Sequence, residues 1–238
     1  MSDAAVEYVG KDLESMDLAV NYHRWIIDVL RSYFGKDIVE VGAGTGGVSE
    51  MLLREHPRSL TLIEPSRMFD ELSRRMASFD AETKIVLKND LFRSVAPELK
   101  GNVDTIVYIN VLEHIEDDEA ELKAAFDTLR PGGRVCLFVP ANAFLFSDFD
   151  RSIGHFRRYG SGELKAKCER AGLKVVLSRF FDVPGILPWW IKYRVLGSTS
   201  MESSLVELYD KLVVPVTKFV EGVIPPPVGK NLIVVAER

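Results

Sequence analysis

The chain has few of the residues that build disulfide frameworks or metal centres. Among its 238 residues are two cysteines, Cys136 and Cys168, and four histidines. The cysteines lie far apart in the sequence, without the paired spacing of a disulfide scaffold or a metal site. We therefore expect two buried, reduced thiols and no bound metal.

An excess of positive charge is also absent. The 30 lysines and arginines are outnumbered by 35 acidic residues, which gives a formal net charge of -5. A protein that binds polynucleotides gains affinity from a basic surface, because each neutralised phosphate releases counterions. No nucleic-acid partner is expected.

Long apolar runs are missing too. No stretch approaches the roughly 18 consecutive apolar residues of a membrane span. The acidic start "MSDAAVEYVGKDLESMD" lacks the basic and apolar regions of a signal peptide. We therefore expect a cytoplasmic protein. Because repeats and low-complexity linkers are also lacking, residues 1–238 are interpreted as one domain.

The sequence does contain a regular alternation of short apolar strands and amphipathic helices. This alternation is typical of a parallel sheet with helices on both faces, which binds ligands beyond the carboxyl ends of its strands. Residues 1–35 are expected to form an N-terminal helical cap, and residues 183–228 a helical insertion before the last strand. The predicted helices are 17–34, 47–54, 66–77, 117–129 and 161–171, and the predicted strands are 38–41, 59–64, 84–87, 103–110, 133–140, 173–181 and 231–237.

The turn after the first strand, in "DIVEVGAGTGGVSEMLL" at 37–53, has two interpretations. Gly42, Gly44 and Gly47 fit the G-x-G-x-x-G pattern of a dinucleotide site. Glu40, Gly42, Gly44 and Gly46 fit an E-x-G-x-G-x-G pattern instead. The turn alone therefore does not identify the ligand.

Residues outside the turn help to choose between the two ligands. Glu64, at the end of the second strand, suits either of them, because both carry ribose hydroxyls. A short-chain reductase would need a Tyr-x-x-x-Lys pair, and none of the seven tyrosines has a lysine four residues later. The nicotinamide interpretation thus lacks a catalyst, although it stays open as an alternative.

Further motifs follow in order: "LIEPS" at 62–66, "ND" at 89–90, "NVLEHIEDD" at 110–118 and "LRPGGRVCLFVP" at 129–140. Together with Glu40 and the glycine turn, this set resembles the class I S-adenosylmethionine-dependent methyltransferase superfamily over nearly the whole chain. The stretch D-x-x-x-G-H-x-R-R-Y at 150–159 is also similar to one bacterial branch of it. The resemblance implies S-adenosylmethionine as cofactor and a Rossmann-like seven-stranded sheet of order 3-2-1-4-5-7-6, with strand seven antiparallel.

The resemblance also implies which residues contact the cofactor. The glycines would let the backbone approach without Cβ clashes, Glu40 would lie near the ammonium, and Glu64 would accept both ribose hydroxyls. A purely structural turn, and a local cap or pair for Glu40, remain alternatives. Asp90 and Leu91 would lie at the adenine, and Asn110 and Val111 at the methionine part. The full expected set is Tyr22, Trp25, Glu40, Gly42, Ala43, Gly44, Gly46, Glu64, Pro65, Asn89, Asp90, Leu91, Asn110 and Val111.

The methyl acceptor is expected near "FSDFDRSIGHFRRYGSGEL" at 146–164, which follows the fifth strand. An imidazole can serve as a general base near neutral pH, so His155 is the candidate base and Asp150 the group that orients it. His155 could equally tie this loop to the following helix. His114, in "LEHIED", is interpreted as supporting a helix start.

Three arginines and two aromatic residues complete the predicted acceptor site. Guanidinium groups bind carboxylates and phosphates bidentately, so Arg151, Arg157 and Arg158 suit an anionic acceptor. They could equally pair with nearby acids such as Asp148 or Glu163. Of the aromatic residues, Tyr159 is expected beside the arginines and Trp189 in the wall of the acceptor pocket.

The insertion is strongly apolar. The segment "ILPWWIKYRVLG" at 186–197 is apolar around most of a helical circumference, and "LVELYDKLVVPVTKFV" at 205–220 is apolar every three or four positions. These helices are expected to cover the acceptor pocket as a lid, or to touch a bilayer if Trp189 and Trp190 are exposed. Either arrangement indicates an acceptor with a hydrophobic portion.

The sequence thus favours a methyltransferase for a small or lipid-like acceptor, with an anionic group as an option, and with methylation at oxygen rather than at nitrogen or carbon. Two alternatives remain. One is an NAD(P)-dependent reductase, and the other is a catalytically silent methyltransferase-like subunit that binds a partner. The natural acceptor and the oligomeric state are left open.

Overall fold

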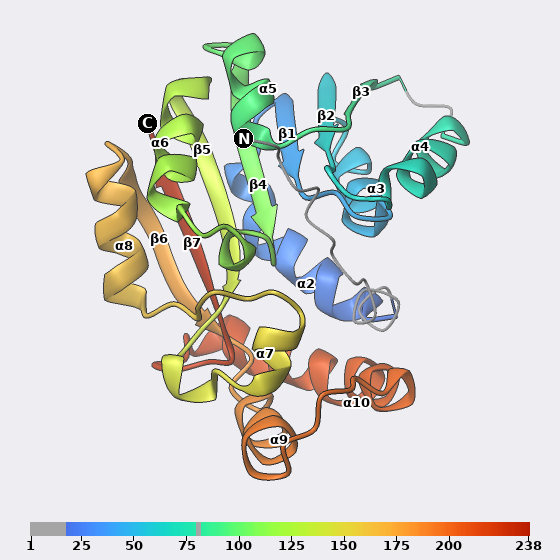
Figure 1. The fold of residues 1–238 in the computed structure, drawn as a ribbon, viewed down its shortest axis with the longest axis vertical. Coiled ribbons are helices and arrows are strands. Elements are labelled where there is room, and N and C mark those ends of the chain that lie inside the picture. Colours follow the sequence, from blue (N-terminus) through green and yellow to red (C-terminus); the bar gives the residue numbers. More distant parts are fainter. Residues whose placement is uncertain (1–17, 80–81) are drawn as a thin grey trace.

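The computed structural model describes residues 18–79 and 82–238, which contain one seven-stranded sheet (Figure 1). Its strand order is β3-β2-β1-β4-β5-β7-β6, and β7 runs antiparallel to both β5 and β6. The predicted sheet is therefore confirmed. The strands are β1 (Asp37–Val41), β2 (Ser59–Ile63), β3 (Lys84–Lys88), β4 (Val103–Ile109), β5 (Leu129–Pro140), β6 (Lys174–Phe181) and β7 (Asn231–Glu237).

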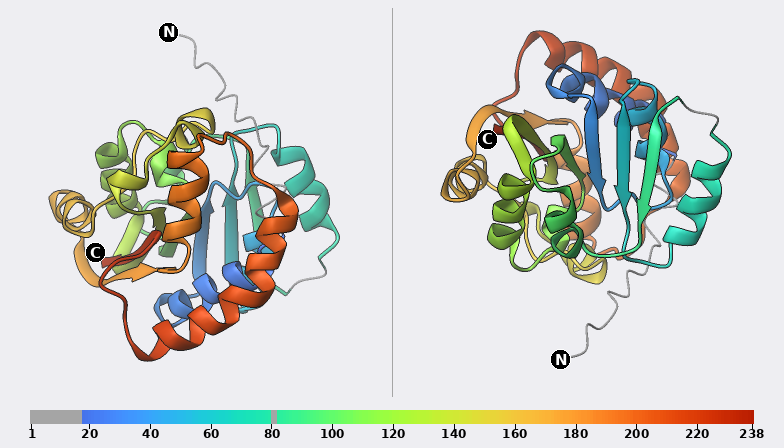
Figure 2. Two further views of the ribbon diagram at one scale, coloured as in Figure 1. Left: turned by 90° about the horizontal axis from the view of Figure 1, so that it is seen from below. Right: turned by 90° about the horizontal axis from the view of Figure 1, so that it is seen from above.

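Helices cover both faces of this sheet (Figure 2). One apolar cluster packs α5, α6 and α8 against one face, and a second packs α2, α3, α4 and α10 against the other. Both cysteines are buried and free in these clusters, as expected. The helices of the main body are α2 (Val20–Leu30), α3 (Gly47–Leu53), α4 (Phe69–Ala77), α5 (Phe92–Leu99), α6 (Asp118–Thr128) and α8 (Ser161–Arg170).

The carboxyl ends of β1, β2, β4 and β5 meet at one edge of the sheet, because these strands are parallel. The glycine turn follows β1, Glu64 follows β2, and Asn110 follows β4. Helices α7 (Asp148–Ser152), α9 (Ile186–Trp189) and α10 (Ser203–Val223) gather beyond this edge (Figure 1). The edge is where this fold binds ligands.

Helix α2 lies at the same edge and is held there from a distant part of the chain. The carboxylate of Asp210, on α10, accepts hydrogen bonds from the backbone N–H of Asn21 at 3.0 Å and of Tyr22 at 2.8 Å. These are amide donors of the first helical turn, which lack a partner within the helix. The cap predicted over residues 1–35 lies partly outside the described residues, since they begin at Leu18.

The predicted insertion is helical in the structure. After β6 the chain forms α9, a π-helical turn at Trp190–Val195 and the long helix α10 before it returns to β7. It leaves and rejoins the sheet at neighbouring points, because Phe181 and Asn231 are paired across β6 and β7. Among the described helices, none is both long and apolar enough to cross a membrane.

Candidate functional site

A cavity of about 310 Å³ opens at the carboxyl edge of the sheet. Its wall combines the glycine turn, the ends of β2 and β4, the loop after β5 and the insertion. Most of the predicted site residues come together here. From the predicted sets, the wall contains Tyr22, Glu40, Gly42, Ala43, Gly44, Glu64, Pro65, Leu91, Asn110, Val111, His155, Arg158 and Trp189.

The glycine turn requires glycine for two physical reasons. Gly42 has a φ of 72°, and a Cβ there would lie 2.5 Å from Cγ2 of Val111. Gly44 has a φ of 57°, and a Cβ there would meet nothing within 4 Å. Left-handed backbone favours glycine at both positions. The turn thus presents bare backbone to the cavity at Gly44, and it packs tightly on Val111 at Gly42.

Glu64 is held in one orientation by the backbone. One carboxylate oxygen accepts a hydrogen bond from Gly44 N at 2.8 Å, and the other accepts one from Ser66 N at 2.9 Å. A carboxylate oxygen has two lone pairs, so each keeps capacity for a ligand hydroxyl. A fixed carboxylate of this kind suits the two adjacent hydroxyls of a ribose.

Glu40 is buried in the cavity wall with one partner. The hydroxyl of Ser49 donates to its carboxylate at 2.5 Å, and no basic side chain is paired with it among the described residues. Burial, with the nearby charge of Glu64, raises the pKa of this carboxyl to about 8. A ligand ammonium placed there would supply the missing positive charge. The predicted local partner therefore exists, and the site still fits a cation.

Asn110 adopts an uncommon backbone conformation at the end of β4. Its φ is 53°, and its backbone N–H donates to the carbonyl of Phe138 on β5 at 2.9 Å. Asparagine adopts this left-handed region more readily than most residues other than glycine. The conformation turns the chain at the end of β4, where Asn110 and Val111 line the cavity.

Four of the predicted cofactor residues do not line the cavity. Trp25 is buried against Phe181, with ring centroids 3.7 Å apart. Gly46, at the start of α3, packs on Leu72. Asn89 donates a hydrogen bond to the backbone carbonyl of Glu64 at 2.8 Å. The exposed Asp90 accepts one from the backbone N–H of Leu91 at 2.7 Å. Their observed contacts support the walls of the site.

Asp150 organises the loop after β5, from which His155 and Arg158 line the cavity. Nδ1 of His155 lies 3.0 Å from one oxygen of this fully buried carboxylate, and Arg158 donates to the same oxygen through Nε at 2.9 Å. Ser147 donates its backbone N–H and hydroxyl to the other oxygen, each at 2.8 Å. Although burial alone would raise the pKa of Asp150, these partners lower it to about 2.

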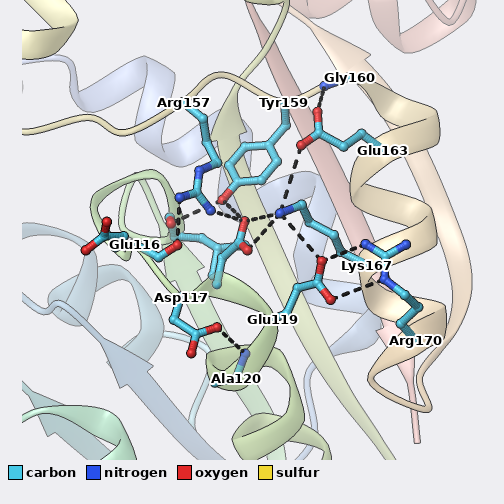
Figure 3. A network of polar contacts seen from close by, with 12 residues as sticks. Glu116, Asp117, Glu119, Ala120, Arg157, Tyr159, Gly160, Glu163, Lys167 and Arg170 are labelled. Atoms are coloured by element: carbon cyan, nitrogen blue, oxygen red, sulfur yellow. Dashed lines mark hydrogen bonds and ion pairs between the residues drawn. The ribbon is translucent and has the colours of Figure 1, made fainter.

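Arg158 lines the cavity, but its charge is already balanced by Asp150. The other predicted anion-binding residues face elsewhere. Arg151 pairs with Asp148 at 2.5 Å, and Arg157 pairs with Asp118 at 2.7 Å. The hydroxyl of Tyr159 donates to Asp118 at 2.8 Å, within the polar network that also contains Lys167 (Figure 3). Arg151, Arg157 and Tyr159 are thus each bound to an acidic side chain of this chain and do not line the cavity.

The structure adds a residue that the sequence analysis did not single out. Glu113 is fully buried beside the cavity, and both of its carboxylate oxygens lack a hydrogen-bond partner. Burial raises its pKa to about 7. Nε2 of His155 lies 3.8 Å from Oε1 of Glu113, and the rings of His114 and His155 are 4.6 Å apart. The only signal in the sequence is "LEHIED", which also suits a helix start.

Comparison with known proteins agrees with this geometry. A profile described as a methyltransferase domain matches residues 21–178. The protein named ubiquinone biosynthesis O-methyltransferase of Xanthomonas euvesicatoria pv. vesicatoria is 24% identical over 182 residues, which cover 70% of this chain and 73% of that protein. An uncharacterized methyltransferase of Bacillus cereus is 28% identical over 160 residues, which cover 65% and 70%.

A solved structure has the same fold. The SAM-dependent methyltransferase of Archaeoglobus fulgidus superposes with a TM-score of 0.64 at 14% identity, over 98% of this chain and 100% of that one. The profile match spans more than half of this chain. The cavity also offers what the cofactor needs, namely a buried carboxyl, a fixed second carboxylate and bare backbone at Gly44. The chain therefore belongs to the methyltransferase domain family and is an S-adenosylmethionine-dependent methyltransferase.

Proposed function

We propose that this protein methylates an oxygen atom of a small or lipid-like molecule. The observation that carries the proposal is that Glu40, Glu64 and His155 line one cavity, which can hold the cofactor at the two glutamates and the acceptor at His155. S-adenosylmethionine, held at Glu40 and Glu64, would supply an electrophilic methyl group for transfer to the acceptor oxygen, with its sulfonium sulfur as the leaving group. The names of the ubiquinone-biosynthesis relatives support oxygen as the acceptor atom.

In this proposal the chain's own residues mainly align the reactants and exclude water. Glu40 holds the cofactor ammonium, and Glu64 holds the ribose. Asn110 and Val111 contact the methionine part, and Leu91 lies at the adenine. Asn89 and Asp90 support that end from outside the wall through the hydrogen bonds described above. Trp25 and Gly46 act in the same indirect way.

The acceptor oxygen is activated at His155 in this proposal, and Asp150 is the positioning residue. Asp150 fixes the imidazole through Nδ1, which directs Nε2 towards Glu113 and the cavity. An acceptor hydroxyl has to lose its proton during transfer, and Nε2 of His155 would accept that proton as general base. The side chain of Trp189 lines the space beside it and donates from Nε1 to the carbonyl of Leu145 at 3.3 Å.

A second cavity supports an acceptor with an apolar tail. It measures about 190 Å³ and lies under α9, the π-helical turn and α10. It shares Tyr22, Trp189, Met201 and Lys230 with the main cavity, so the two spaces adjoin. The acceptor head would react at His155 while its tail extends beneath α10. The inner side of the insertion thus serves as a lid.

The outer side of α10 supports contact with a membrane surface. Its apolar residues recur every three or four positions on one side, and Phe219 and Leu212 are 75% and 64% exposed. The basic residues Lys192 and Arg194 lie on the neighbouring π-helical turn. An amphipathic helix of this kind binds the lipid interface in the plane of the membrane. The exposed stripe consists of Leu205, Leu208, Leu212, Val216, Phe219 and Val223.

The reaction is tested with the purified chain, labelled S-adenosylmethionine and extracts that contain small molecules and membrane lipids. We expect a new methylated species by mass spectrometry, with its label on oxygen. His155→Ala should lower the yield at least about tenfold. The matched control is His56→Asn, since His56 is exposed at the far end of α3 and its left-handed φ of 52° is one that Asn tolerates.

Cofactor binding is measured separately by calorimetry. Glu64→Ala should weaken S-adenosylmethionine binding at least about tenfold, because two charge-assisted hydrogen bonds are lost. Cofactor binding without any methylated product would instead favour a catalytically silent subunit. Equal affinity of Glu64→Ala and the parent chain would reject the proposed cofactor site.

A further inference from the structure

Three potential ligand groups converge at the acceptor end of the cavity. Glu113, His114 and His155 each offer one ligand atom, and these atoms all lie within 4.8 Å of one another. All three residues line the cavity. Neighbouring ligand atoms on a four-coordinate zinc ion lie about 3.3 Å apart, as follows from metal–ligand distances near 2.0–2.1 Å. The three ligand atoms are thus slightly farther apart than in a metal-bound site, and small side-chain rotations would bring them to binding distance.

Glu113 is the observation that points to a ligand. Its side chain is fully buried, yet neither carboxylate oxygen has a hydrogen-bond donor. Buried carboxylates are normally paired or bound to a metal, because an unpaired one is costly. Arg158, a buried cation of the loop after β5, is already bound to Asp150. The structure therefore leaves Glu113 facing the cavity with its oxygens unsatisfied.

The surroundings of His155 have the arrangement that supports metal ligands. Asp150 binds Nδ1 of the imidazole, so Nε2 is the nitrogen that faces Glu113. Metal-binding histidines almost always hold a carboxylate or carbonyl through the other ring nitrogen. Asp150 is itself fixed by Ser147 and Arg158. Gly154 has a φ of 84° and brings the loop close to His114. A Cβ added at Gly154 would lie 3.6 Å from Nδ1 of His114.

We propose that Glu113, His114 and His155 bind one divalent transition-metal cation at the acceptor end of the cavity. Two histidines and one glutamate form a ligand set of catalytic zinc sites, in which further positions stay open to water or substrate. The open side here faces the cavity.

The role of the cation rests on the function proposed above, whereas its binding does not. A cation at this place would contact the acceptor hydroxyl and lower its pKa, as a Lewis acid does for bound water. The hydroxyl proton would leave to solvent. His155 would then activate the acceptor as a ligand rather than by taking the proton itself.

The test uses the full chain, stripped with a chelator and dialysed. It is titrated with Zn²⁺ alone by calorimetry and with Co²⁺ alone by visible absorption, which reports nitrogen and oxygen ligands. We expect one cation per chain. Asp150→Asn should weaken Zn²⁺ binding by about 10- to 100-fold, Glu113→Gln and His155→Gln should weaken it further, and His56→Asn should leave it unchanged.

Each variant is also titrated with S-adenosylmethionine, and retained cofactor affinity shows that the site is folded. Absence of stoichiometric Zn²⁺ and Co²⁺ binding, or equal Zn²⁺ affinity in Glu113→Gln, His155→Gln and the parent, overturns the proposal. A chain that binds Zn²⁺ as expected but methylates nothing overturns the proposed function and leaves the metal site standing.

Discussion

At the scale of single residues, the buried carboxyl of Glu40 connects folding with cofactor binding. In the unfolded chain it ionises near pH 4.5, whereas burial raises its pKa to about 8 in the folded protein. The folded state therefore holds more protons between these values, and stability falls as the pH rises from about 4.5 to about 8. The Glu40 carboxyl thus lowers the stability of the cofactor-free protein at neutral pH. It lies in the cavity wall at the place where the ligand ammonium is proposed to bind.

Glu40→Gln removes this ionisation. We expect its melting temperature without cofactor to exceed that of the parent at pH 7.5, by an amount that corresponds to about 1–3 kcal/mol, and to match it near pH 5. Scanning calorimetry at the two pH values measures the difference. Cofactor affinity should fall in the same variant. A melting temperature at pH 7.5 equal to or below the parent's contradicts this account of Glu40.

Proton release upon cofactor binding gives an independent check. Because an ammonium favours the ionised form of Glu40, binding near pH 7 should release close to one proton in the parent and none in Glu40→Gln. Calorimetry in two buffers with different ionisation enthalpies counts that proton. Equal counts for both chains would mean that another group titrates.

The glycine turn allows a matched pair of substitutions. Gly42→Ala forces a left-handed φ and a Cβ only 2.5 Å from Cγ2 of Val111, so we expect a loss of about 2–4 kcal/mol in unfolding free energy. Gly44→Ala meets only the backbone strain and should lose about 1 kcal/mol. Denaturant unfolding measures both. Adding Val111→Ala to Gly42→Ala should restore part of the loss, and a failure to do so would refute the clash.

The predicted site residues differ in how directly the sequence determines their position. Glu40, Glu64 and Asn110 line the cavity, because strand ends in a parallel sheet have fixed positions. Arg157 and Tyr159 do not line it, since their partner Asp118 lies about 40 residues earlier in the chain. A one-dimensional pattern does not show such a pairing.

At the scale of elements, α2 and α10 are joined through one carboxylate. Asp210→Ala removes the acceptor for two amides at the start of α2. We expect it to lower unfolding free energy by about 1–2 kcal/mol, the usual loss for an N-cap. Asp210→Asn keeps a side-chain acceptor and should lose less. Thermal melts of the two variants compare them, and equal losses would show that the amides find other partners.

Most predicted elements match the structure, and the differences have local causes. No helix was predicted for residues 88–102, because Pro97 interrupts the helical pattern of the sequence. The structure nevertheless contains α5 there, with Phe92, Val95 and Ala96 buried. Strand β5 begins at Leu129 rather than at residue 133, because Leu129 pairs with Val103 ahead of an irregularity in the ladder. The short helix α7 within the predicted loop depends on the reciprocal bonds of Ser147 and Asp150.

At the scale of the whole molecule, the exposed stripe on α10 gives a testable surface property. The double variant Leu212→Glu with Phe219→Glu replaces two of the most exposed apolar side chains by charges. We expect it to reduce binding to vesicles of phosphatidylglycerol and phosphatidylethanolamine at least about tenfold, because it removes apolar area and adds repulsion. Vesicle flotation measures this. Unchanged flotation would assign the stripe to another partner.

The topology of the molecule was predictable because the motif order fixes which strands precede which turns, and the family resemblance supplies the strand order. The proposed metal-ligand cluster was not predictable, and we expected no metal from the sequence. Glu113 and His114 follow β4, whereas His155 lies in the loop after β5, so only the folded sheet brings them together.

The pairing of Phe181 with Asn231 has a consequence for how this enzyme is built. The segment between them departs from and returns to adjacent positions of an antiparallel hairpin, so the sheet does not depend on its length. Chimeras that exchange this segment between homologues but keep Asp210, which holds the start of α2, should retain cofactor binding and acquire a new acceptor preference. The hairpin thus allows the segment between its two strands to vary without a change in the sheet.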